Sequence, residues 1–176
     1  ELELATEVFE RCVAHGYAKD GVISQSQDQA RKLWKFREGI TESIAKHTPF
    51  KSDVSVRESK IPHFLRKLEE ILIESVPQLE AVLFGHLGDG NIHINLLKPF
   101  DMQMQEFREE CEKVSNLIFE LVQKLDGSIS AEHGIGLVKK PYLKYSRDKA
   151  DRNYMKGVKR IFDPKNIMNP GKLLDA

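Results

Sequence analysis

The sequence predicts an α+β domain in which helices cover a mostly antiparallel sheet, and three observations predict it. Apolar side chains recur at helical spacing in five segments of the chain. Residues 51–56 alternate polar and apolar side chains, which is typical of a strand with one buried face. Asp89-Gly90 separates two apolar runs, which is a common signal of a β-hairpin and therefore of antiparallel pairing.

The first half of the chain is predicted to alternate between helices and strands. In chain order the elements are a helix that ends at Gly16, a short strand at 20–24, a helix over 28–46, a strand over 51–56 and a helix over 62–75. The last of these begins at Pro62, because proline is favoured in the first helical turn. The long helix is unusual, since Trp34, Arg37 and Thr41 form a line beside its apolar stripe. A cation and a hydroxyl group therefore border its core face.

The second half is predicted to contain the hairpin and two further helices. In chain order the elements are a hairpin over 80–97, a helix over 103–125, a glycine-punctuated segment over 127–136, a helix over 148–162 and a turn-rich tail over 163–172. No internal repeat or flexible linker separates them. We therefore predict one domain over residues 1–176.

The charge and the cysteines exclude several classes of protein. The 27 basic and 27 acidic side chains cancel, so no net field attracts nucleic acid. No run of 18 apolar residues predicts a membrane span. Cys12 and Cys111 lie in helical patterns without a CxxC spacing, so both are predicted to be reduced core thiols. A cytoplasmic location is expected, with a peripheral place at the inner membrane in a complex as the alternative.

The hairpin is predicted to carry a metal site. A two-residue turn at Asp89-Gly90 would place His86 directly opposite His93, with Cβ atoms about 4.5 to 5.5 Å apart. Period two puts Asn95 on the same face as His93. The alternatives are a solvated polar face and a phosphate-binding loop. A phosphate loop is disfavoured because a strand follows the glycines, where such loops require a helix N-terminus.

Glu132 is the candidate for a third, acidic ligand. Two histidines and one carboxylate are a common ligand set for zinc and also suit manganese or iron. A short strand over residues 128–132 would carry Glu132 to its end, beside His133. Adjacent residues of an ideal strand point to opposite faces, so both can address one site only if the chain bends near Gly134 and Gly136. A surface pair of glutamate and histidine is the alternative.

Three ordered motifs resemble the C-terminal portion of the FAD-linked oxidases of the vanillyl-alcohol-oxidase type. They are GHLGDGNIHIN at 85–95, GSISAEHGIGLVKKPYL at 127–143 and IFDPKNIMNPGKLL at 161–174. The nearest branch is that of glycolate oxidase, the FAD-linked D-lactate dehydrogenases and D-2-hydroxyglutarate dehydrogenase. The resemblance implies a ferredoxin-like cap domain over the substrate, with FAD held mainly by an N-terminal domain that this chain lacks. The chain has no starting methionine and opens within a helical pattern, as expected of part of a longer protein.

The resemblance also implies roles for individual residues. A divalent metal, usually zinc, would be held by His86, His93 and Glu132, and His133 would accept the proton of the substrate hydroxyl. The remaining ligand-binding positions are Arg37, Thr41 and Lys51 at the substrate carboxylate, Asn95 near the substrate and Asn169 near the flavin. The residue types suit this chemistry, because a metal polarises the hydroxyl and the ordinary pKa of histidine is near neutral.

The implied activity is the FAD-dependent oxidation of a D-2-hydroxy acid, of the glycolate, D-lactate or D-2-hydroxyglutarate type, to the 2-oxo acid. The isolated chain is expected to be inactive. Expected partners are the 2-hydroxy acid, the N-terminal FAD domain and an electron acceptor, and a homodimer is an open alternative. Two other functions stay open at this point, a stand-alone metal-binding or ligand-sensing module and a metal-dependent hydrolase.

Overall fold

The computed structural model, which describes residues 2–175, contains a three-stranded antiparallel sheet. The strands are β1 (Phe50–Ser55), β2 (Glu80–His86) and β3 (Asn91–Leu97), and their order in the sheet is β1-β3-β2. The strand predicted at 51–56 and the hairpin strands are therefore confirmed. The described residues divide into two compact units, with the boundary between Ser43 and Ile44.

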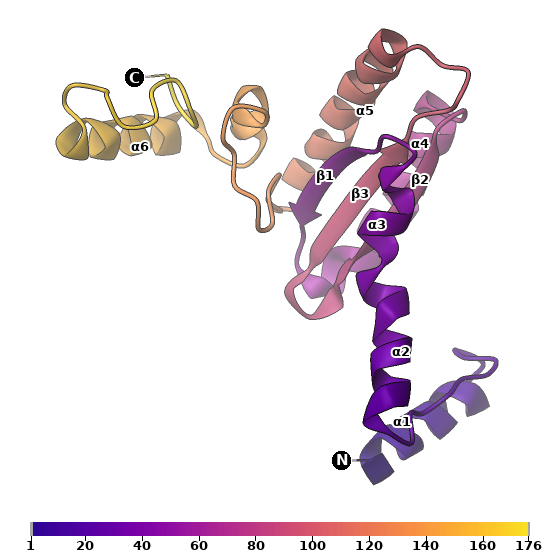
Figure 1. Cartoon of the computed structure of the whole chain (residues 1–176). Helices are drawn as coiled ribbons and strands as arrows, with labels where there is room; N and C mark the ends of the chain where they lie inside the picture. Colours follow the sequence, from indigo (N-terminus) through magenta and orange to yellow (C-terminus); the bar gives the residue numbers. More distant parts are fainter. Residues whose placement is uncertain (1, 176) are drawn as a thin grey trace. The chain divides into compact units, whose positions relative to one another are not determined.

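Two helices cover one face of this sheet (Figure 1). They are α4 (Ile61–Ser75) and α5 (Met104–Lys124), which pack against each other, and α5 also contacts β1. Because side chains alternate along a strand, Ile92, Ile94 and Leu96 of β3 all point into this core. Cys111 of α5 is fully buried here, as predicted, whereas Cys12 is only half-buried. The predicted helix-covered antiparallel sheet is confirmed.

The topology is that of a split β-α-β motif. The connection from β1 through α4 leads to β2, and β3 then returns between them. Ser128, after α5, forms a single antiparallel bridge with Ser55 on the outer edge of β1. This is the position of the last strand in a ferredoxin-like β-α-β-β-α-β fold, here reduced to one bridge. The bridge brings the segment after residue 127 to the edge of the sheet.

The N-terminal unit departs from the prediction in two places. It contains α1 (Leu2–Ala14) and α2 (Gln27–Glu38), and α3 (Ile40–Ala45) crosses the boundary of the unit. The long helix predicted over 28–46 is interrupted at Gly39, because glycine is a poor helix former. The strand predicted at 20–24 was wrong, and these residues pair with no strand among residues 2–175. A short apolar run specifies a strand only where a neighbour completes its hydrogen bonds.

The C-terminal segment consists of a 3-10 helix, η3 (Lys140–Tyr145), the helix α6 (Lys149–Phe162) and a turn-rich tail. Asp148 caps α6 by accepting the N–H of Asp151 at 2.8 Å, so the predicted start is confirmed. None of the residues of α6 is buried. No helix within residues 2–175 combines the length and the apolar character that a membrane crossing requires.

The turn of the hairpin is longer than predicted. The register pairs His86 with Asn91 and Phe84 with His93, so the loop has four residues, with a 3-10 turn, η2 (Leu87–Asp89), followed by Gly90. A two-residue type I′ turn needs positive φ at both central positions, whereas only Gly90 has it here, at 69°. The predicted direct opposition of His86 and His93 was therefore wrong, and the two residues are diagonal neighbours on one face.

Gly90 is expected to be the residue of this turn that tolerates substitution least. A Cβ atom at Gly90 would lie 1.8 Å from the carbonyl oxygen of Val56, and its φ is in the left-handed region. We expect Gly90→Ala to lower the free energy of unfolding by about 3 kcal/mol, measured by urea denaturation. Gly88→Ala is the matched control, because nothing lies within 4 Å of a Cβ there. Equal midpoints for the two variants would contradict this account.

Candidate functional site

The face of the sheet opposite the helices is polar and carries His93. In the register, His93 of β3 lies between Asp53 of β1 and Phe84 of β2, and Asn95 lies opposite Lys51. His93 and Asn95 share this face, as the alternation along β3 predicted. Asp53 is 4% exposed and Asn95 3%, so these two polar residues of the face are buried, whereas Lys51 is exposed.

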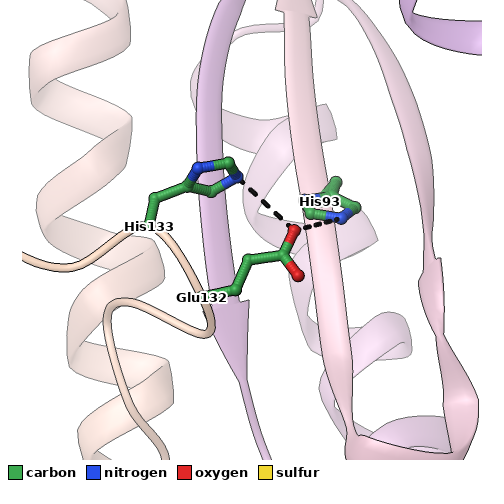
Figure 2. Close-up of side chains that lie close together, drawn as sticks. All are labelled: His93, Glu132 and His133. Carbon is green, nitrogen blue, oxygen red and sulfur yellow. Dashed lines mark ion pairs between the residues drawn. The ribbon is translucent and has the colours of Figure 1, made fainter.

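Glu132 and His133 reach this face from the loop that follows the Ser128 bridge. Figure 2 shows their side chains extending past β1 toward His93. An oxygen of Glu132, Oε1, lies 3.4 Å from Nε2 of His93 and 3.5 Å from Nε2 of His133. One ligand atom from each of the three residues lies within 4.8 Å of the other two. The three side chains thus form a cluster that could hold a metal ion.

The chain bends at this cluster, which is the condition for Glu132 and His133 to address one site. Gly134 has φ of 76° and Gly136 has φ of 54°, values that favour glycine. The predicted strand over residues 128–132, however, was wrong, because only Ser128 is paired and residues 131–133 form a bend. Adjacent residues of a strand would point to opposite faces. The bend is what allows Glu132 and His133 to address one site.

Sequence reasoning missed Asp53, whose carboxylate organises the bend. Its Oδ2 atom accepts the backbone N–H groups of Ala131, Glu132 and His133 at 2.9, 3.0 and 3.3 Å. Its Oδ1 atom accepts a hydrogen bond from the ammonium group of Lys139. Lys139 therefore belongs to a buried ion pair. The signal in the sequence that could have indicated this role was an aspartate at one of the polar positions of the alternating strand β1.

The electrostatics of the site favour a charged Asp53 and a neutral His93. Burial raises the pKa of Asp53, but the hydrogen bond from Lys139, the backbone N–H groups and the charge of Lys139 outweigh it, so the pKa lies below its ordinary value. Burial lowers the pKa of His93, and the negative charge of Glu132 offsets this only in part. A neutral imidazole is the form that binds a metal ion.

His86 lies on the same face but outside the tight cluster. Its ring centroid is 6.3 Å from that of His93, compared with 6.1 Å between His93 and His133. Its Nδ1 atom lies 3.8 Å from a carboxylate oxygen of Asp89, and half of its side chain is exposed. The ligand atoms that lie within 4.8 Å of one another are those of Glu132, His93 and His133, whereas His86 lies two residue pairs further along the hairpin.

The predicted substrate residues occupy two regions of the chain. Lys51 is exposed and pairs in register with Asn95, whose amide donates to the carbonyl oxygen of Val82 at 3.3 Å. These two residues therefore neighbour the cluster on the polar face. Arg37 is half-buried on α2, and Thr41 is exposed on α3. Both belong to the N-terminal unit, and their roles stay predictions.

Asn169, the predicted flavin contact, lies in the C-terminal tail, whose first turn is stabilised by hydrogen bonds to the side chain of Asp163. The carboxylate of Asp163 accepts the backbone N–H groups of Ile167 and Met168, both at 2.9 Å, and pairs with Lys159. The hydrogen bond from Lys159 lowers the pKa of Asp163 and keeps it charged. Asn169 has φ of 49° and lines a groove of about 670 Å³ between α6 and the tail. Its role toward the flavin stays a prediction.

Comparisons with known proteins agree on one family. The family model described as FAD linked oxidases, C-terminal domain, matches residues 1–173. The chain is 52% identical to a D-2-hydroxyglutarate dehydrogenase of Stutzerimonas stutzeri, over 99% of this chain and 38% of the relative. It is 49% identical to one from Xanthomonas citri, over 98% of this chain and 36% of the relative. A putative mitochondrial D-lactate dehydrogenase of Schizosaccharomyces pombe is 38% identical, over 95% and 33%. The chain thus spans about a third of the length of these relatives.

Proposed function

We propose a role on the substrate side of a flavin-dependent oxidation for this chain, which belongs to the family of FAD-linked oxidase C-terminal domains. The relatives are named as dehydrogenases of D-2-hydroxyglutarate and D-lactate, which are both D-2-hydroxy acids. The full-length protein would oxidise a D-2-hydroxy acid to the 2-oxo acid. A preceding domain of the same protein would bind most of the FAD, and an electron acceptor would reoxidise it.

The donor atoms of the cluster fit a divalent metal such as zinc. Two ligands of one tetrahedral zinc ion, each about 2.0 to 2.1 Å from it, lie roughly 3.4 Å apart. His93 and Glu132 have this separation. His86, His93 and Glu132 would hold the ion, with the ring of His86 turned from Asp89 toward His93. When bound, the metal would polarise the substrate hydroxyl and ease its loss of a proton.

His133 would accept the proton of the substrate hydroxyl. Two thirds of its side chain is exposed, so a substrate can reach it, whereas the side chain of His93 is 15% exposed. The Glu132 carboxylate beside it would stabilise the imidazolium that forms. The proton would pass from the hydroxyl oxygen to His133, and FAD, when bound, would take the hydride from C2.

The substrate carboxylate would be held by cationic and hydroxyl groups. Lys51 and Asn95 support this proposal, because they neighbour the cluster in the register of β1 and β3. Arg37 would grip the carboxylate through two parallel hydrogen bonds, with Thr41 as a further donor. These contacts would orient the C2 hydrogen toward the flavin. Asn169 in the tail would contact the flavin itself.

The convergence of Glu132 with His93 and His133 on the polar face carries the proposal. The metal ion and the base, His133, would lie side by side, so that the metal can polarise the hydroxyl group of the substrate while His133 takes its proton. The same cluster could activate water in a hydrolase. Membership of an FAD-linked oxidase family favours oxidation, both over hydrolysis and over a stand-alone binding module.

The experiment that tests this function is reduction of the flavin by a panel of 2-hydroxy acids in the full-length protein. We expect single-turnover bleaching of the flavin absorbance by at least one of D-2-hydroxyglutarate, D-lactate and glycolate. The L enantiomers of 2-hydroxyglutarate and lactate are the matched controls, because inversion at C2 would point the hydrogen away from the flavin. Full-length protein with bound flavin that none of the three acids reduces would contradict the proposal.

A further inference from the structure

Asp53 is a buried carboxylate within the sheet face that carries the candidate site. It lies in the middle of β1, directly opposite His93, and is 4% exposed. A carboxylate in such a position is costly unless it is paired and hydrogen-bonded. Each oxygen of Asp53 has partners, Lys139 on Oδ1 and three backbone N–H groups on Oδ2. The Asp53 carboxylate is thus a buried charge beside the candidate site, although the proposed function makes it neither a metal ligand nor the base.

The contacts of Asp53 determine the direction of the neighbouring loop. Three consecutive N–H groups, from Ala131 to His133, converge on one oxygen, which is possible only for a bent backbone. In this bend the side chains of Glu132 and His133 both reach the face of His93 (Figure 2). Ser130 also donates to the carbonyl oxygen of Gly134 at 2.8 Å and closes the bend from within.

Lys139 ties the same loop to β1 from its other end. Its ammonium group donates to the Asp53 side chain and, at 2.9 Å, to the Asp53 carbonyl oxygen. Its side chain is 12% exposed. The neighbouring Lys140 instead pairs with Asp175 of the tail, whose side chain is largely exposed. Of the two adjacent lysines, only Lys139 contacts the residue that shapes the site.

We propose that Asp53 is a positioning residue, which acts with Lys139 as its counter-charge to hold the 131–133 backbone so that Glu132 is aimed at the metal held by His93. The inference rests on the metal site of the proposed function. Asp53 would touch neither the metal nor the substrate. Its effect on metal binding would be exerted through Glu132.

The test is a double-mutant cycle with Co²⁺ as the metal probe in the full-length protein. We expect Asp53→Asn to weaken Co²⁺ binding by about 10- to 100-fold, as loss of a group that orients a metal ligand does. In a Glu132→Gln background the same change should cost less than about twofold, because its effect passes through Glu132. The same factor in both backgrounds would mean a general structural role and would overturn the proposal.

The two lysines provide a matched comparison, which also serves if Asp53→Asn does not fold. Lys139→Met is expected to weaken Co²⁺ binding by several-fold, and Lys139→Arg to restore most of it, since arginine returns a hydrogen-bonding cation. Lys140→Met should bind Co²⁺ like the wild type. Wild-type affinity in Lys139→Met, or an equal loss in Lys140→Met, would overturn the proposal.

Amide exchange separates this inference from the metal site itself. The N–H groups of residues 131–133 should be protected in the wild type and in Lys140→Met, and should exchange at least about tenfold faster in Asp53→Asn. A wild-type protein that binds no Co²⁺ would contradict the proposed metal site, and the exchange rates would still decide whether Asp53 holds the loop. Unchanged exchange in Asp53→Asn would overturn that role.

Discussion

Replacement of His133 by alanine in the full-length protein is expected to lower the rate constant of flavin reduction by roughly 10² to 10⁴-fold, the usual contribution of a positioned general base. The metal content of the variant should stay near that of the wild type. The reason is that His133, the more exposed histidine of the cluster, would take the hydroxyl proton without holding the metal. Single-turnover flavin reduction and metal analysis on the same samples measure both quantities.

The structure also gives a defined meaning to the opposite outcome, in which the His133→Ala variant loses its metal. A ring nitrogen of His133 lies close enough to the ligand atoms of His93 and Glu132 for these three residues to form the metal site among themselves. A His133→Ala variant that loses its metal completely would favour that ligand set and would refute the separate role of the base. His63→Ala is the control, because His63 is an exposed histidine of α4, on an element that packs against the opposite face.

Replacement of His86 by alanine is expected to remove metal and activity together. If His86, His93 and Glu132 hold the ion, loss of one of three protein ligands leaves only one imidazole and one carboxylate, which is too few for a stable zinc site. We expect less than about a tenth of the wild-type metal content after dialysis, and flavin reduction slowed at least as much as in His133→Ala.

Metal content alone distinguishes the two possible ligand sets, which share His93 and Glu132 and differ in whether His86 or His133 is the third ligand. His86 is half-exposed, and its ring must turn away from Asp89 to join the site. If the His86 variant keeps its metal and the His133 variant loses it, the cluster seen in the structure is the metal site. Asp89→Asn serves as the control, since it removes the carboxylate that contacts His86 but leaves the imidazole in place. We expect its metal content to stay near that of the wild type.

The sequence by itself determined the features that depend on local periodicity. Alternation along β3 placed His93 and Asn95 on one face and Ile92, Ile94 and Leu96 on the other, because a strand has period two. The apolar spacing and Pro62 located α4, and the glycines after His133 permitted the bend that the structure has there. The ordered motifs indicated the family that the comparisons confirm.

The tertiary structure alone decided the features that depend on contacts between distant residues. The register of the hairpin shifted by two residues because the loop contains a 3-10 turn, which replaced the direct opposition of His86 and His93 by a diagonal one. The pairing of Asp53 with Lys139 joins residues 86 positions apart, which no local pattern encodes. The alternation along a strand predicts which face a side chain occupies, whereas its neighbour on the adjacent strand depends on the register in which the strands pair. The candidate ligands could therefore be found in the sequence, whereas Asp53, which accepts the backbone N–H groups of residues 131–133, could be found only in the fold.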